Sequence, residues 1–213
     1  MRGFSPSLTT IYMFKIICVT NRALCKEDFL TRIKKLCEAG VDGIILREKD
    51  LSLAEYTALA NSVLEVCRRY KVPCILHNFE ESAIALNLPE IHMPLGSFRA
   101  LPEWKKSLFE VIGVSCHSVE DALAAERMGA SYLIAGHVFE TDCKRGVPAR
   151  GLDFLTQVVE ETYIPVYAIG GITPENVQEV KNIGAAGLAG VCIMSSAMTC
   201  EDPQDYIRRL KGL

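Results

Sequence analysis

Residues 43–76, GIILREKDLSLAEYTALANSVLEVCRRYKVPCIL, contain one complete strand–helix–strand unit and indicate the architecture of the whole chain. The apolar run at 43–46 predicts a short buried strand. A helix is predicted after Ser52, which has Glu55 three residues later in the spacing of a capping box. Residues 73–76 are predicted to be the next strand. This order of elements is typical of the βαβ unit of a parallel sheet.

The same alternation of short apolar and longer amphipathic runs recurs about eight times along the chain. The predicted strands are 14–20, 43–46, 73–76, 90–93, 111–115, 131–135, 165–169 and 187–193. The predicted helices are 28–39, 52–70, 80–86, 101–108, 118–128, 152–162, 174–183 and 203–210. Eight βα units predict a single (β/α)8 TIM barrel with parallel strands. An open doubly wound sheet is the alternative, but no G-x-G-x-x-G follows the first strand.

Composition narrows the functional classes. The net charge of the 213 residues is -3, which gives no reason to expect a nucleic-acid partner. No apolar stretch is long enough for a transmembrane helix, so no membrane partner is expected. The nine cysteines are scattered without a C-x-x-C pair, which favours reduced thiols in a cytoplasmic protein over disulfides or a zinc site. Residues 1–12 are expected to be a disordered or non-native extension before a barrel domain at 13–213.

Polar residues follow almost every predicted strand, at the end of the barrel where catalytic groups collect. The candidates that carry the argument are Arg47, Lys49, Asn78, Ser115, His137, Lys144, Gly170, Gly171, Ser195 and Ser196. The loops after strands seven and eight are the usual phosphate site of TIM barrels. Gly170 and Gly171 let the backbone approach an anion, and Ser195 and Ser196 begin a short extra helix with free N–H groups. Alternatively, the two glycines only turn the chain before the predicted helix cap Thr173.

Two of these residues have competing interpretations. Arg47 follows a strand and can hold a carboxylate or phosphate in a forked pair, or it can form a surface salt bridge with Glu48 or Asp50. His137 directly follows the sixth strand and can take and return a proton near neutral pH. Its alternative is a hydrogen bond to a neighbouring loop carbonyl.

Several motifs together are similar to those of the thiamine phosphate synthase / TenI superfamily. They are Arg47-Glu48-Lys49, Asn78, Gly113-Val114-Ser115, the loop 136–144 and Ala168-Ile169-Gly170-Gly171-Ile172. The resemblance covers the chain from Met13 onward. The loop GHVFETDCKRG, residues 136–146, most resembles the TenI branch, the thiazole tautomerases.

The departures from the synthase pattern point to the same branch. Synthases carry an Asn-Asp pair after strand three and an acidic stretch after strand four, whose aspartates hold the magnesium that binds a pyrimidine diphosphate. Here Phe79 follows Asn78, and residues 93–98 read MPLGSF. Because Mg²⁺ prefers carboxylate oxygens, the resemblance implies a protein without a metal or other cofactor.

The resemblance therefore implies an isomerase that aromatises a thiazole carboxylate phosphate tautomer in thiamine biosynthesis. His137 is then expected to shuttle the proton and Arg47 to pair with the carboxylate. The phosphate is expected on Gly170, Gly171, Ser195 and Ser196, and the remaining pocket residues are expected to be Lys49, Asn78, Ser115 and Lys144.

Two other functions stay open from the sequence. One is thiamine phosphate synthase, a transferase that joins a pyrimidine diphosphate to a thiazole phosphate. The other is a non-catalytic sensor of a phosphorylated ligand. The expected partner in every case is a small phosphorylated molecule, and a homo-oligomer is a further expectation from the resemblance. The roles of Glu140, Asp142 and Cys143 are left open.

Overall fold

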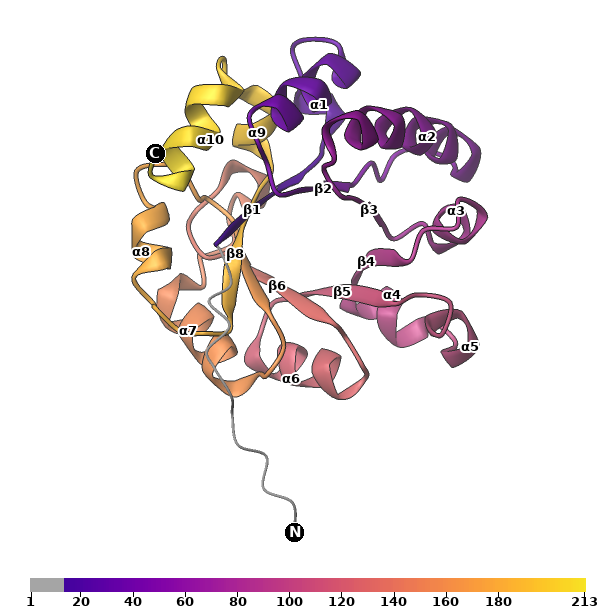
Figure 1. The fold of residues 1–213 in the computed structure, drawn as a ribbon. Coiled ribbons are helices and arrows are strands. Elements are labelled where there is room, and N and C mark those ends of the chain that lie inside the picture. The colour runs from indigo at the N-terminus through magenta and orange to yellow at the C-terminus, as the bar shows by residue number, and fades with distance from the viewer. Residues whose placement is uncertain (1–13) are drawn as a thin grey trace.

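The computed structural model describes residues 14–213, and eight parallel strands form a closed barrel in sequence order (Figure 1). The strands are β1 (Lys15–Val19), β2 (Gly43–Leu46), β3 (Cys74–His77), β4 (Glu90–Pro94), β5 (Val111–Cys116), β6 (Tyr132–Gly136), β7 (Val166–Ile169) and β8 (Leu188–Ile193). The barrel closes where β1 pairs with β8, with Lys15 beside Gly190. The predicted TIM barrel is confirmed. The expectation for residues 1–12 lies outside the described residues.

Helices surround the barrel on its outer side (Figure 1). They are α1 (Phe29–Glu38), α2 (Leu53–Tyr70), α3 (Glu80–Ala85), α4 (Leu95–Ala100), α5 (Glu103–Lys106), α6 (Val119–Arg127), α7 (Gly151–Glu161), α8 (Val177–Lys181), α9 (Ser195–Thr199) and α10 (Pro203–Lys211), with short 3₁₀ turns η1 (Arg22–Leu24) and η2 (Asp142–Lys144). The amphipathic helices bury their apolar stripes against the strands.

The alternation of side chains along each strand separates two apolar clusters. In β1, Ile16 and Cys18 pack outward in the large cluster between sheet and helices. Ile17 and Val19 belong to a small cluster inside the barrel, together with Ile45. Successive side chains of a strand point to opposite faces, so every second residue continues the inner row toward the strand end. Because all the strands are parallel, their carboxyl ends and the polar residues beyond them lie at one mouth of the barrel.

Local signals set most helix boundaries. The Ser52 side chain accepts from the Glu55 N–H and the Glu55 side chain binds back to Ser52, so the predicted capping box is confirmed. The helix predicted at 101–108 is shorter in the structure, where α5 spans Glu103–Lys106 and a separate helix α4 ends at Ala100. Pro102 disfavours helical backbone at the residue before it, and Leu101 is extended with ψ 122°.

The helix after β7 is also shorter than predicted. The sequence predicts a helix at 174–183 capped by Thr173, whereas α8 spans Val177–Lys181. The Asn176 amide accepts from the Thr173 N–H at 2.8 Å and donates to the Gly171 carbonyl at 2.8 Å. These contacts hold residues 173–176 in a turn that supports the glycine loop, and the helix begins after it.

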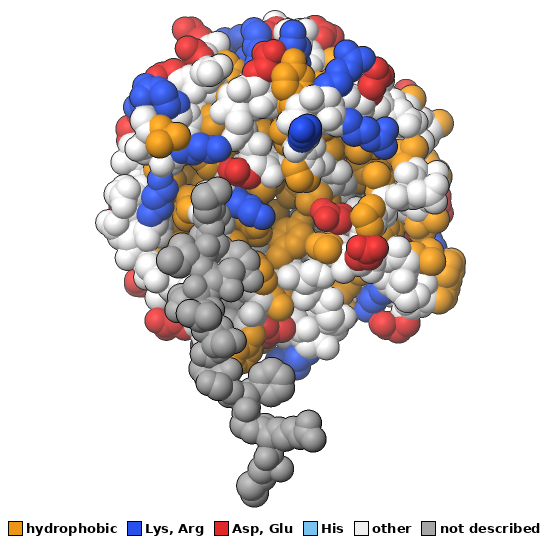
Figure 2. All heavy atoms as spheres, viewed as in Figure 1, with side chains coloured by type: hydrophobic (Ala, Val, Ile, Leu, Met, Phe, Trp, Pro, Cys, Tyr) orange, Lys and Arg blue, Asp and Glu red, His pale blue; other side chains and the backbone are white. Residues whose placement is uncertain are grey.

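The face of the molecule in Figure 2 carries acidic and basic side chains interspersed around its rim, with apolar side chains between them. Within residues 14–213, none of the helices combines the length and the hydropathy that crossing a membrane requires.

Gly113 in β5 makes room for an aromatic ring that crosses the barrel interior. A Cβ at this position would lie 2.0 Å from Cζ of Tyr132 on the neighbouring strand β6. Tyr132 packs in the inner cluster and contacts Tyr167 edge to face, with ring centroids 5.7 Å apart. The ring of Tyr132 therefore occupies the space that a side chain at 113 would fill.

We predict that Gly113→Ala lowers the free energy of unfolding by about 1–3 kcal/mol, because the inserted methyl group overpacks the barrel interior. Urea denaturation of both proteins measures the difference. Gly96→Ala is the matched control, because no atom of the described residues, beyond its chain neighbours and the backbone of its own helix, lies within 4 Å of its added Cβ, and alanine favours helix α4. Equal destabilisation by both substitutions would contradict this packing explanation.

Candidate active site in the barrel mouth

A cavity of about 310 Å³ lies at the carboxyl ends of the strands. It is lined by most of the residues that the sequence analysis selected: Arg47, Lys49, Ser115, His137, Lys144, Gly170, Gly171, Ser195 and Ser196. Asn78 is not among the lining residues. Its side chain is exposed, and its backbone adopts a left-handed conformation, with φ 63°. The barrel thus brings together Ser115 near the end of β5 and the selected residues that follow β2, β6, β7 and β8.

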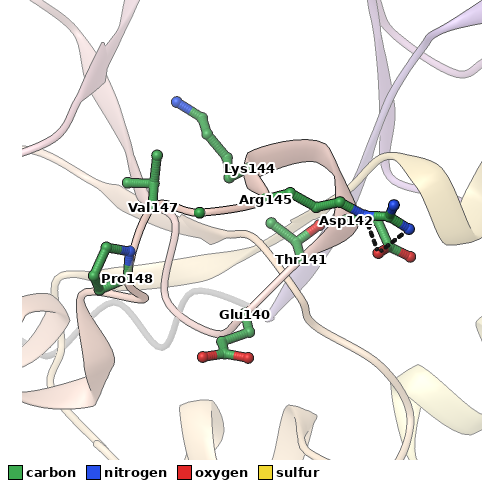
Figure 3. Close-up of a pocket in the computed structure, with 8 residues that line it drawn as sticks. Glu140, Thr141, Asp142, Lys144, Arg145, Val147 and Pro148 are labelled. Atoms are coloured by element: carbon green, nitrogen blue, oxygen red, sulfur yellow. Dashed lines mark hydrogen bonds and ion pairs between the residues drawn. The ribbon is translucent and has the colours of Figure 1, made fainter.

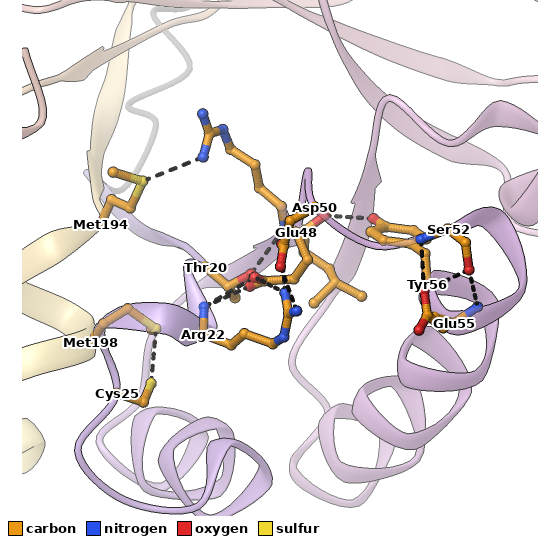
Figure 4. A network of polar contacts seen from close by, with 12 residues as sticks. Thr20, Arg22, Cys25, Glu48, Asp50, Ser52, Glu55, Tyr56, Met194 and Met198 are labelled. Carbon is orange, nitrogen blue, oxygen red and sulfur yellow. Dashed lines mark hydrogen bonds and ion pairs between the residues drawn. The ribbon is translucent and has the colours of Figure 1, made fainter.

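A buried carboxylate organises the ends of β1 and β2. Glu48, which is 2 % exposed, accepts a 2.6 Å hydrogen bond from the Thr20 hydroxyl. It also accepts from the backbone N–H of Arg22 at 3.0 Å and from its guanidinium at 3.2 Å (Figure 4). The Thr20 hydroxyl oxygen in turn accepts from the backbone N–H of Arg47 at 2.9 Å. This network fixes the two strand ends against each other.

These contacts decide between the two interpretations of Arg47. Both carboxylates that were candidates for pairing with Arg47 are engaged by Arg22, which also binds Asp50 through two hydrogen bonds of 2.7 and 2.6 Å. The Arg47 guanidinium instead lines the cavity, where it contacts the Met194 sulfur at 4.0 Å (Figure 4). The surface salt bridge is therefore not formed, and Arg47 faces the site.

Two more cations share this mouth. Lys49 and Lys144 line the same cavity as Arg47. The positive charge of Arg47, followed by burial and the charge of Lys144, lowers the pKa of Lys49. Burial lowers the pKa of Arg47. An anion in the cavity would relieve this mutual repulsion.

A neutral histidine stands behind the Ser115 hydroxyl. Nε2 of His92 lies 2.8 Å from Ser115 Oγ, and its Nδ1 lies 3.2 Å from the Tyr132 hydroxyl. Burial, with a smaller contribution from His77, holds the pKa of His92 well below its usual range. Because a neutral imidazole has one donor and one acceptor, each nitrogen has a partner and the ring orients Ser115.

His137 lies in the cavity wall and is 5 % exposed. Its Nε2 lies 3.2 Å from the Val147 carbonyl, which is the loop contact that the sequence analysis named as the alternative. Its own carbonyl accepts from the Arg150 N–H at 3.0 Å. These contacts join the two ends of the loop after β6. A catalytic role of His137 stays a prediction.

The loop after β6 also borders a second hollow of about 600 Å³ (Figure 3). Glu140 and Asp142 line this outer hollow and not the mouth cavity, and Asp142 pairs with Arg145 at 3.0 Å. Lys144 borders both spaces, and Cys143 lines the mouth. Figure 3 shows Glu140 and Lys144 pointing in opposite directions from the loop.

The glycines after β7 allow two loops to meet. A Cβ on Gly170 would lie 2.2 Å from Cβ of His137, and one on Gly171 would lie 2.3 Å from the Glu140 carbonyl oxygen. The N–H of Phe139 donates to the Gly170 carbonyl at 3.0 Å. Gly170 and Gly171 are therefore required for packing, and they also leave backbone exposed to the cavity beside Ser195 and Ser196. The short helix α9 begins at Ser195, as predicted.

The lining residues do not form a metal site of the kind that the synthase pattern of the family implies. In the part of the chain that the structure describes, neither Asp nor Glu lines the mouth cavity, and no group of three or more His, Cys, Asp and Glu could hold a metal ion. Mg²⁺ needs several oxygen ligands in octahedral geometry. Phe79, where the acidic residue of the synthase pattern would stand, instead stacks on Tyr56 with ring centroids 3.8 Å apart.

Fold and site together define a TIM-barrel protein whose mouth cavity is lined by three cationic side chains. The family described as thiamine monophosphate synthase (TMP-TENI) matches residues 16–196, and the chain belongs to this family. It is 34 % identical over 195 residues to the thiamine-phosphate synthase of Clostridium acetobutylicum, covering 89 % of this chain and 90 % of that protein. It is 35 % identical over 197 residues to the Desulfitobacterium hafniense (strain Y51) thiamine-phosphate synthase, covering 89 % and 92 %.

A solved structure agrees with these relatives. The thiamine phosphate pyrophosphorylase from Pyrococcus furiosus superposes with a TM-score of 0.79 at 27 % identity, covering 94 % of this chain and 95 % of that one. The expectation of an isomerase, a thiazole tautomerase, is therefore wrong: the relatives that match almost the whole chain are named as synthases. That expectation relied on a few local departures, which carry less weight than similarity along the full length.

Buried neutral imidazoles make the stability of the fold depend on pH. Burial, with smaller contributions from Arg47 and Lys49, lowers the pKa of His77 to about 4. As the pH falls below about 6.5, the unfolded chain takes up a proton that folded His77 refuses until about pH 4. We predict that His77 alone lowers the free energy of unfolding by about 1.4 kcal/mol per pH unit in this window.

Urea denaturation of the unmodified protein and of His77→Asn from about pH 4 to about pH 8, a range that covers that window, measures this contribution. The variant should show the shallower slope on the acid side, with parallel behaviour above about pH 7. His92, which is also buried, leaves part of the slope in both proteins. Identical slopes in the two proteins would show that His77 does not contribute.

Proposed function

We propose that this protein is a thiamine-phosphate synthase, a transferase that joins a pyrimidine carrying a methylene diphosphate to a thiazole phosphate. The observation that carries the proposal is the composition of the mouth cavity. Three cations, Arg47, Lys49 and Lys144, lie in the same cavity as the loops that contain the glycine pair and Ser195. Two anionic substrates need two anion-binding regions, and the cations and these loops supply one each. The relatives that match nearly their full length are named as synthases.

The reaction exchanges one bond for another. The carbon–oxygen bond between the pyrimidine methylene group and the diphosphate breaks, and the diphosphate leaves with the electron pair. The thiazole ring nitrogen supplies the pair for the new carbon–nitrogen bond. Negative charge grows on the departing diphosphate, so fixed cations that face it stabilise the transition state more than the ground state.

The residues divide between the two substrates. Arg47, Lys49 and Lys144 bind the diphosphate through charge-assisted hydrogen bonds. The backbone at Gly170 and Gly171, with the Ser195 and Ser196 hydroxyls, holds the thiazole phosphate, as the loops after strands seven and eight do in many barrels. The Arg47 contact with Met194, which immediately precedes Ser195, makes the two regions neighbours.

The floor of the cavity orients the pyrimidine. Ser115 offers its hydroxyl to the ring, and His92 fixes the direction of that hydroxyl from behind. His137 holds the loop after β6 closed through Val147, which places Lys144 over the cavity. We assign His137 this positioning part in the transferase.

The cellular setting is part of the same proposal. All nine cysteines of the chain are free, which fits a reducing compartment such as the cytoplasm. A small phosphorylated thiazole as the partner and a homo-oligomeric state remain predictions.

We predict that the purified protein converts the pyrimidine diphosphate and thiazole phosphate to thiamine phosphate, followed by chromatography of the product. Lys144→Gln should reduce kcat/KM by about tenfold or more, because one charge-assisted hydrogen bond to the leaving group is lost. Arg145→Gln removes the same charge from the same loop but does not line the mouth, so it should retain activity. Absence of product both with Mg²⁺ and with a chelator would contradict the proposed function.

A further inference from the structure

The mouth cavity has an uncompensated positive charge. Arg47, Lys49 and Lys144 line it, and its lining includes neither Asp nor Glu within residues 14–213. The four histidines do not add an anionic partner, since an imidazole is neutral or cationic. An anion that enters this cavity therefore meets three cations and no competing carboxylate.

The carboxylates near the mouth either have basic partners of their own or lie outside the cavity. Glu48 is buried against the Thr20 hydroxyl and Arg22, and Asp50 is paired with the same arginine. On the other side of the mouth, Asp142 is paired with Arg145, and Glu140 faces the outer hollow (Figure 3). None of these four acidic groups lines the cavity that the cations line.

This charge distribution selects the ligand. The cations repel one another: the charge of Arg47, followed by burial and the charge of Lys144, lowers the pKa of Lys49, while burial lowers the pKa of Arg47. A multiply charged anion offsets the repulsion, whereas a free divalent cation meets the same repulsion and finds no carboxylate oxygen to bind. Arg47, Lys49 and Lys144 thus supply the positive charge that a metal ion would otherwise supply to a diphosphate.

We infer that the barrel mouth binds a diphosphate group directly through Arg47, Lys49 and Lys144, without a divalent cation. The inference rests on the proposed function only for the natural ligand, a pyrimidine diphosphate. It departs from the magnesium-dependent binding that the synthase pattern implies, because the mouth cavity, within the described part of the chain, lacks the carboxylates of that pattern.

Isothermal titration calorimetry with inorganic pyrophosphate tests the inference, with one titration in EDTA and one in excess Mg²⁺. We expect binding in EDTA that is at least as tight as binding in Mg²⁺, because Mg²⁺ reduces the charge of pyrophosphate and gains no ligand from the protein. Binding that needs Mg²⁺, or that Mg²⁺ strengthens, would overturn the inference, as would no binding in either buffer.

Variants locate the site. Lys49→Gln and Lys144→Gln should each weaken binding in EDTA by about tenfold, as expected for one charge-assisted hydrogen bond. Both side chains are exposed, and thermal unfolding shows whether the variants fold. Arg145→Gln, which carries the same charge change outside the mouth, should bind like the unmodified protein. Equal affinity of all the variants would place the anion elsewhere and overturn the inference.

The outcome is separable from that of the proposed function. A protein that binds pyrophosphate in EDTA but forms no thiamine phosphate would retain this binding site and lose the transferase assignment. A protein that forms thiamine phosphate but binds pyrophosphate only with Mg²⁺ would retain the transferase assignment and lose the metal-independent site.

Discussion

The rest of the site depends on the hydrogen bonds that hold the buried Glu48 carboxylate against Thr20 and Arg22. Arg47 and Glu48 are adjacent and oppositely charged, and at the end of a strand their side chains point to opposite faces. The buried Glu48 carboxylate is satisfied by Thr20 and Arg22, which offsets the cost of removing it from water. Because these contacts occupy it, the guanidinium of Arg47 is left to face the cavity without an acidic partner.

The register of the barrel adds the remaining groups to the same mouth. His77 pairs with His92 across β3 and β4, and His92 pairs with Gly113 across β4 and β5, so the inner row continues from strand to strand. Gly113 gives space to the Tyr132 ring, whose hydroxyl lies beside His92. The neutral imidazole of His92 thereby links Tyr132, inside the barrel, to Ser115, which lines the mouth cavity.

The sequence predicts much of this arrangement, because apolar runs locate the strands and residues directly after parallel strands must share one end. It cannot show that Asn78 adopts a left-handed conformation outside the cavity, or that Asn176 rather than Thr173 precedes α8, since both depend on contacts with neighbouring loops. Met194, one residue beyond β8, lines the cavity and contacts Arg47, but its apolar side chain did not mark it as a site residue in the sequence. The tautomerase interpretation was wrong because acidic residues missing at two short segments outweighed the remainder of the chain. The absence of these acidic residues leaves the mouth cavity positively charged.

A double-mutant cycle on pyrophosphate affinity in EDTA, with Arg22→Ala, Arg47→Ala and both together, tests the central claim most directly. If Arg22 acts by keeping Glu48 away from Arg47, its loss should weaken binding only while Arg47 is present. The double variant should then bind like Arg47→Ala alone, a coupling well above the about 0.5 kcal/mol of independent sites. Losses that simply add would mean that Arg22 contributes only distant charge, and they would contradict the account.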